Sequence, residues 1–137
     1  MRDRVILDTG TLVSALVYPN RLCGMALRHA MARYELAGSA RTLSHFVRIL
    51  RDDVFGAWRA IDERAKFAEL VADATARFEP RHPFGDCGFA VRSNDMYAEL
   101  AVDSGAACLV SSQRDVLGLG GFRGTRFVSP AEFLALY

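Results

Sequence analysis

The sequence has no long apolar run, few cysteines and almost no net charge, and each absence excludes a class of protein. No apolar stretch approaches the ~20 residues that a membrane-spanning helix needs. Residues 5–7 are the only apolar ones between the charged start and Asp8, so we expect no signal peptide. Cys23, Cys87 and Cys108 form no C-x-x-C pair, and we interpret them as reduced, apolar-like thiols. We therefore expect a cytoplasmic protein.

The charge and composition describe an ordinary globular chain. The formal net charge is +1, so attraction to a nucleic acid would have to come from a local patch of basic residues. The chain has 137 residues, of which 51% are hydrophobic and 24% are charged. This length suits one hydrophobic core and is short for two. We expect a single domain over residues 1–137.

Short apolar runs alternate with segments of helical periodicity along the chain. This alternation predicts an α/β fold, a three-layer α/β/α sandwich around a mostly parallel sheet. Residues 80–88 are rich in proline and glycine and predict an irregular connection, and residues 118–124 predict a flexible connection without a phosphate-loop pattern. We expect strands at residues 5–7, 34–37, 107–110 and 126–128, and helices at 12–17, 22–34, 42–51, 61–77, 95–104, 115–119 and from 130 onward.

Polar residues directly follow two of the predicted strands. Asp8 follows residues 5–7, and residues 111–115 follow the strand at 107–110. In parallel sheets, ligands bind outside the carboxyl ends of the strands. The sequence therefore places Asp8 and Asp115 at the functional edge of the sheet.

Residues 5–10, Val-Ile-Leu-Asp-Thr-Gly, also match the signature of aspartic proteases. Those enzymes need two aspartates that share a proton within an all-β framework. Here a helix follows at once, and no second signature of this kind is found in the sequence, although a homodimer would supply one. We regard the protease interpretation as the weaker one, because it contradicts the predicted fold.

A second resemblance covers nearly the whole chain. Residues 5–16 look like the strand, Asp-Thr-Asn and helix that open a PIN domain, and residues 34–43 look like its second strand and the next helix. Residues 95–110 match the spacing of its acidic helix, and residues 109–117 resemble its Val-Thr-Gly-Asp-x-Asp-Leu-Leu segment. Residues 124–134 also match. The chain therefore resembles the PIN-domain family, and in pattern the PIN-type toxins of bacterial toxin–antitoxin pairs.

This resemblance implies an acidic pocket that holds Mg²⁺ or Mn²⁺ and cleaves RNA. Hard divalent cations stabilise the developing charge and activate a water molecule, and they need several carboxylate oxygens. The family pattern assigns Asp8, Asp95 and Asp115 as metal ligands and catalytic residues. Ser111 and Gln113 would then orient water or phosphate. Implied partners are RNA, a cognate antitoxin protein and, through the helix at residues 22–34, a second copy of the chain.

The sequence departs from the family pattern at the site itself. Gly10 stands where the family usually has asparagine, and His45 stands where a helix normally supplies a glutamate. Asn94 replaces an acidic neighbour of Asp95, and Gln113 replaces the first aspartate of the last cluster. Three carboxylates remain as candidate ligands, which makes the predicted acidic site a thinned one.

Each candidate residue also has an ordinary structural explanation. Asp8, Asp95 and Asp115 could cap helices or favour their positive ends. His45 is most simply a solvated helix residue, although as a ligand it would suit Mn²⁺ or Zn²⁺ better than Mg²⁺. The arginines at positions 41, 48 and 51 either touch phosphate or form a solvated face.

Two functions remain from the sequence. The first is a metal-dependent endoribonuclease of PIN type, the toxin of a toxin–antitoxin pair. The alternative is a PIN-like module that has lost catalysis and binds RNA or a partner protein.

Overall fold

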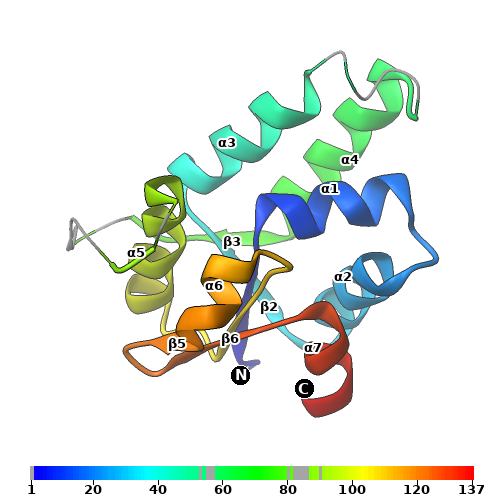
Figure 1. Cartoon of the computed structure of the whole chain (residues 1–137). Coiled ribbons are helices and arrows are strands. Elements are labelled where there is room, and N and C mark those ends of the chain that lie inside the picture. The colour runs from blue at the N-terminus through cyan, green and yellow to red at the C-terminus, as the bar shows by residue number, and fades with distance from the viewer. Residues whose placement is uncertain (1, 53, 55–57, 80, 82–86, 90) are drawn as a thin grey trace.

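The computed structural model describes residues 2–52, 54, 58–79, 81, 87–89 and 91–137. Its centre is a six-stranded sheet with the strand order β3-β2-β1-β4-β6-β5 (Figure 1). Every neighbouring pair is parallel except β5 with β6, which is antiparallel. The strands are β1 (Arg4–Leu7), β2 (Glu35–Gly38), β3 (Thr75–Arg77), β4 (Cys108–Val110), β5 (Gly121–Phe122) and β6 (Thr125–Val128).

Helices cover both faces of this sheet, because alternate residues of the buried strands point to opposite sides. Val5 and Leu7 of β1 belong to the core beneath one helical layer, while Ile6 belongs to the core on the other face. This arrangement confirms the predicted three-layer α/β fold. The helices are α1 (Thr9–Val17), α2 (Leu22–Arg33), α3 (Ala40–Leu50), α4 (Ile61–Ala74), the short 3-10 helix η2 (Arg92–Asn94), α5 (Asp95–Ser104), α6 (Arg114–Leu119) and α7 (Pro130–Leu136).

The two cores divide the helices between the faces. The first core takes side chains from α1, α2, α3, α4 and α7, and the second takes side chains from α5 and α6. Phe46 of α3 and Phe133 of α7 are fully buried in the first core, and Leu109 of β4 is fully buried in the second. Cys108 is buried in β4, as expected for an apolar-like thiol.

Two strands were not predicted from the sequence. The helix expected to reach residue 77 ends at Ala74, because Thr75–Arg77 forms β3 and pairs with β2. The connection expected at residues 118–124 contains β5, which folds back on β6 through Arg123 and Gly124 with positive φ of 46° and 94°. The irregular stretch predicted at 80–88 lies mostly outside the described residues.

The end of α3 is held by a buried arginine from α4. Arg64 is 4% exposed, and its Nη1 donates to the carbonyl oxygens of Leu50 at 2.7 Å and Asp52 at 3.0 Å. The last carbonyls of a helix have no partner within the helix, so this contact satisfies groups that would otherwise be buried and unpaired. In the described part of the chain, no helix has the length and apolar character needed to cross a membrane.

Candidate functional site

Asp8 is placed by the end of β1 and the start of α1. Its Oδ1 accepts hydrogen bonds from the backbone N–H of Thr11 at 2.9 Å and from the Thr11 hydroxyl at 2.7 Å. The same hydroxyl lies 3.2 Å from the carbonyl oxygen of Val110 in β4. Asp8 is 2% exposed and caps α1, as the ordinary explanation predicted. Its second oxygen, Oδ2, is left for the site.

Two amide side chains join Asp8 to Asp115. Gln113 Nε2 donates to Asp8 Oδ2 at 3.3 Å, and Asn94 Nδ2 donates to Gln113 Oε1 at 3.0 Å. Asn94 Nδ2 also lies 3.1 Å from Asp115 Oδ2. We call the side chains of Asn94 and Gln113 the amide bridge. The structure thus brings Asp8, Gln113 and Asp115 together at the carboxyl edge of the sheet, with Asn94 between the last two.

Ser111 holds the backbone of one member of the amide bridge. It is fully buried at the end of β4, and its Oγ accepts the backbone N–H of Gln113 at 3.1 Å. Its hydroxyl therefore shapes the turn that carries Gln113. The Asp115 carboxylate is held in addition by the backbone N–H of Val91 at 3.3 Å.

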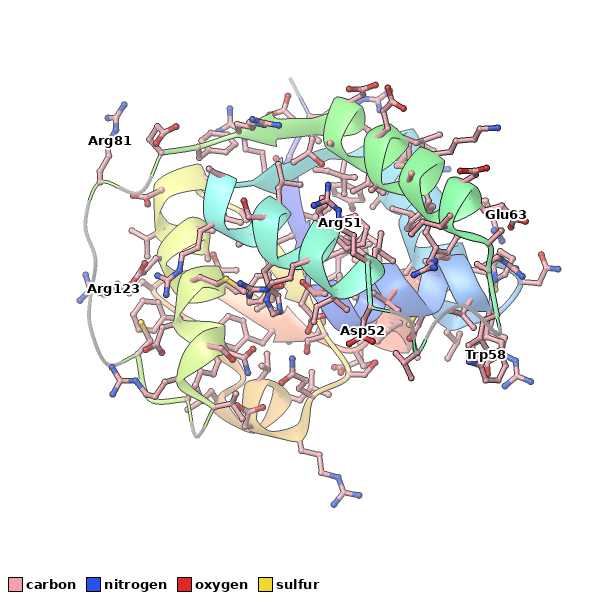
Figure 2. The ribbon with its side chains drawn as sticks, turned by 90° about the horizontal axis from the view of Figure 1, so that it is seen from above. Arg51, Asp52, Trp58, Glu63, Arg81 and Arg123 are labelled. Carbon is pink, nitrogen blue, oxygen red and sulfur yellow. The ribbon has the colours of Figure 1, made fainter. Side chains whose placement is uncertain are left out.

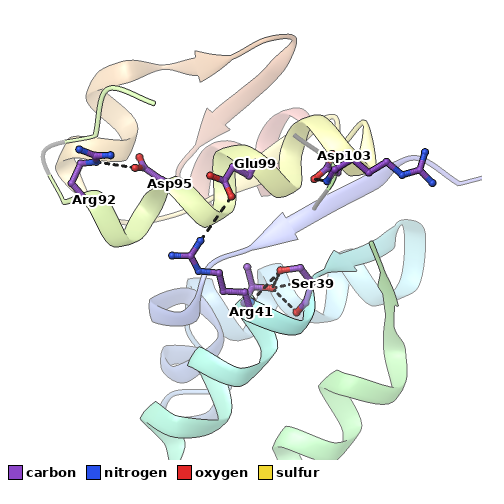
Figure 3. Close-up of polar contacts among 8 residues, drawn as sticks. Ser39, Arg41, Arg92, Asp95, Glu99 and Asp103 are labelled. Atoms are coloured by element: carbon purple, nitrogen blue, oxygen red, sulfur yellow. Dashed lines mark hydrogen bonds and ion pairs between the residues drawn. The ribbon is translucent and has the colours of Figure 1, made fainter. Parts of the chain in front are cut away.

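Asp95 lies apart from the amide bridge. Its Oδ2 pairs with Arg92 Nε at 2.9 Å, on the face of α5 that also carries Glu99 and Asp103 (Figure 3). Glu99 in turn lies 3.9 Å from Arg41 Nη1. The Oδ1 atom of Asp95 is buried and has no hydrogen-bond partner among the described residues. Asp95 therefore takes part in a different set of contacts from Asp8 and Asp115.

His45 lies on the other side of the site, on α3. It lines a cleft of about 360 Å³ together with Gly10, Asn94 and Gln113. Its Nδ1 is 3.0 Å from Arg48 Nη2, and arginine can only donate, so the imidazole is neutral with its proton on Nε2. Burial and the neighbouring Arg48 charge lower the pKa of His45. With this tautomer Nε2 carries the N–H group, and metal ligation by His45 would require the other tautomer or the loss of Arg48.

Tyr97 is a further site residue that was not predicted from the sequence. Its hydroxyl accepts the backbone N–H of Thr9 at 3.0 Å and lies 2.7 Å from the Thr9 hydroxyl. Burial raises the pKa of Tyr97 to about 12, so the phenol stays protonated. Tyr97 also lines the cleft, and it fixes the first residue of α1 against α5.

The residues present do not fit a tightly held Mg²⁺ or Mn²⁺ ion. Mg²⁺ demands near-ideal octahedral coordination by oxygen. Among the residues that the structure describes, no three histidine, cysteine, aspartate or glutamate side chains gather to hold a metal. Between Asp8 and Asp115, the amide N–H groups of Asn94 and Gln113 already donate to the two carboxylates. Hydrogen-bond donors thus occupy the position in which a cation would neutralise Asp8 and Asp115.

Asn94 is a second site residue that was not predicted from the sequence. It stands at the N-cap position of α5, yet its side chain makes no capping hydrogen bond. Its amide is 3% exposed and points into the bridge instead. The available signal was helix geometry, since successive residues of a helix point about 100° apart. When Asn94 faces Asp115, its neighbour Asp95 must face elsewhere.

Comparison with known proteins supports the fold. No protein-family model and no curated protein sequence matches this chain. Among solved structures, VapBC2 from Rickettsia felis, bound to a DNA fragment from its promoter, matches with a TM-score of 0.64 at 10% identity, over 92% of this chain and 98% of that chain. PAE2754 from Pyrobaculum aerophilum matches with a TM-score of 0.64 at 14% identity, over 97% and 88%. These similarities confirm the expected PIN-type fold.

Proposed function

We propose that this chain is a PIN-type protein of a toxin–antitoxin pair that binds single-stranded RNA in the His45 cleft and cleaves it slowly. The observation that carries the proposal is the amide bridge between Asp8 and Asp115. In the family pattern, acidic side chains at the positions of His45 and Gln113 would help to hold a divalent cation. Here neutral groups stand at both positions, and the carboxylates of Asp8 and Asp115 accept hydrogen bonds from amide N–H groups.

The same replacements favour binding of a polyanion. Phosphate groups are repelled by uncompensated carboxylates and attracted by N–H donors and nearby cations. Asp8 is almost fully buried, and its two oxygens are already hydrogen-bonded. His45, which lines the cleft, carries an N–H group on Nε2, and its Nδ1 contacts the Arg48 guanidinium. A phosphodiester would thus meet donors at a site where the family pattern predicts charge repulsion.

A metal-dependent endoribonuclease remains the second candidate. It is favoured by the convergence of Asp8 and Asp115, since Gln113 contacts Asp8, Asn94 contacts Asp115, and the two amides are hydrogen-bonded to each other. Were a cation bound, these two residues would hold it, and it would supply charge stabilisation and an activated water. Ser111 would maintain the turn that carries Gln113.

The partner proteins are part of the proposal. The similarity to VapBC2, solved with a promoter fragment, supports pairing with an antitoxin that binds DNA. Self-association through α2 also remains a prediction. Leu22 and Met25 are 50% and 44% exposed on that helix, which leaves apolar surface for a second copy.

The decisive experiment measures RNA binding and metal-dependent cleavage on the same preparations. Wild type should bind a labelled 12-nucleotide single strand and cleave it slowly with Mn²⁺ or Mg²⁺. The triple variant His45→Glu, Asn94→Asp, Gln113→Asp should cleave at least about tenfold faster, which corresponds to ~1.4 kcal/mol off the barrier. Adding Asp8→Asn should remove the gain, because a ligand is lost.

Asp95→Asn provides the matched control. It removes a carboxylate next to Asn94 in sequence but outside the bridge, and it should leave binding unchanged. Brisk cleavage by wild type that Asp8→Asn abolishes would establish the second candidate instead. Absence of RNA binding by wild type, at low salt and with the fold intact, would overturn the proposal.

A further inference from the structure

A second groove lies beside the cleft, between α3 and the segment formed by α4 and β3. It has a volume of about 560 Å³, and its polar lining comes from Ser44 and Arg48 of α3, from Arg51 at the C-cap of that helix and from Arg77 of β3. The remaining lining side chains are small or apolar, and none is acidic. Figure 2 views the molecule from above and shows the Arg51 side chain between the ribbons of α3 and α4. The described lining of the groove therefore contains three cations and no acidic side chain.

Among the residues that the structure describes, no carboxylate forms an ion pair with any of these three guanidinium groups. Helix α3 contains no aspartate or glutamate. The ion pairs found between described residues involve other arginines, at positions 4, 41, 59 and 92. Arg48, Arg51 and Arg77 are all exposed, and Arg48 has His45 as its side-chain partner. A planar guanidinium that is exposed and without an ion pair is well suited to bidentate binding of phosphate.

One side-chain contact links a residue of the groove to a residue of the cleft. Arg48 lines the groove, and its Nη2 lies 3.0 Å from Nδ1 of His45, which lines the cleft. Positions 41, 45, 48 and 51 follow helical spacing and so share one side of α3. A chain that leaves the cleft over His45 thus meets Arg48 first and then the rest of the groove.

We propose that this groove is a phosphate-binding track that receives the RNA strand where it leaves the cleft, with backbone phosphates on Arg48, Arg51 and Arg77. The inference rests on the proposed function, because it takes RNA as the ligand of the cleft. RNA is favoured over an acidic peptide because the arginines continue a path that begins at the cleft. Such a track reads no bases, so it adds affinity and length dependence without sequence preference.

The test compares RNA lengths and charge-matched variants by fluorescence anisotropy. Arg51→Gln plus Arg77→Gln removes two charges from the groove, and Arg33→Gln plus Arg126→Gln removes two exposed charges near the opposite edge of the sheet. For a 12-nucleotide strand, the groove variant should lower the slope of log K against log salt by about 1.4 and the affinity at 0.1 M salt by about 25-fold. A 4-nucleotide strand should bind both variants like wild type.

Further arms separate this inference from the proposed function. Arg51→Lys plus Arg77→Lys should keep the salt slope, because the charge is retained, and melting curves verify that every variant folds. If the groove and control variants bind the 12-nucleotide strand equally, the track is wrong while the cleft proposal stands. If groove variants lose binding and His45→Ala changes nothing at either length, the groove binds RNA by itself, and both RNA binding in the cleft and the path from cleft to groove are wrong. If wild type binds neither strand, both are wrong.

Discussion

The amide bridge makes a strong prediction about stability when its members become acids. Asn94→Asp plus Gln113→Asp keeps the size of one side chain, shortens the other and places two more carboxylates between Asp8 and Asp115. In wild type, the amides donate to these carboxylates at 3.1 and 3.3 Å. In the variant, each donated hydrogen bond becomes a contact between like charges. Without a cation, the variant should therefore be destabilised.

The magnitude follows from the lost bonds and the new repulsion. Each lost hydrogen bond to a charged group costs about 1.5–3 kcal/mol. Two like charges ~4 Å apart near a protein surface repel by up to about 4 kcal/mol, and water reduces this at the half-exposed Gln113. Since the side chains can turn toward solvent, we expect a net loss of about 3 kcal/mol in the free energy of unfolding. For a chain of this size, that lowers Tm by roughly 10 °C.

The assay is a set of melting curves in EDTA and in millimolar Mn²⁺. In EDTA the variant should melt below wild type, and Mn²⁺ at a hundred times its dissociation constant should return about 2.7 kcal/mol. Mn²⁺ should raise the Tm of wild type much less than that of the variant, because wild type offers fewer carboxylates. The control Ser93→Asp plus Ser112→Asp adds the same two charges on exposed neighbours, and it should be nearly neutral. The reasoning is refuted if Mn²⁺ stabilises wild type as much as the variant, or if the variant is stable in EDTA.

Two further predictions concern buried polar groups. Arg64→Met should lower the free energy of unfolding by about 2 kcal/mol, because the carbonyls of Leu50 and Asp52 lose their donor. Urea unfolding measures this loss. Arg64→Lys should lower the free energy of unfolding by less, because lysine retains a donor. Tyr97 has a pKa of about 12 in the folded protein and about 10 in the unfolded chain, so its contribution is complete below pH 10 and is lost as pH rises toward 12. Urea unfolding between pH 8 and 11 should therefore show a steeper alkaline loss for wild type than for Tyr97→Phe, and equal slopes would contradict this account.

Much of the fold could be predicted because its strands are short, apolar and bounded by turns. Residues 5–7 and 108–110 are buried strands in the structure, as the sequence indicates. β3 was missed because Thr75–Arg77 continues the helical pattern of α4, and its strand state depends on pairing with β2. Local propensity does not contain that information, since tertiary contacts decide it. β5 has two residues, and it too exists through its pairing with β6.

The sequence predicted at which edge of the sheet the candidate site lies, but it did not predict which side chains contact one another there. Asp8, Gln113 and Asp115 could be found because residues that follow parallel strands meet at one edge. Asn94 and Asp95 are adjacent in sequence, and choosing between them requires the rotation of α5 about its axis. That rotation is set by buried partners such as Tyr97, whose hydroxyl contacts Thr9 across the sheet edge.

β1 lies between β2 and β4 in the sheet, and this position bears on when the site forms during folding. On one side Val5 pairs with Leu36, and on the other it pairs with Cys108, far later in the chain. Bringing Cys108 to Val5 closes a longer loop than bringing Leu36 to Val5, and it therefore costs more chain entropy. We therefore expect β4 to pair with β1 after β2 has done so. Asp8 leaves the ribosome long before Asn94 and Gln113 are synthesised, and until they arrive its Oδ2 is without their donors. We therefore expect the amide bridge to form late in folding, when the later half of the chain packs against β1.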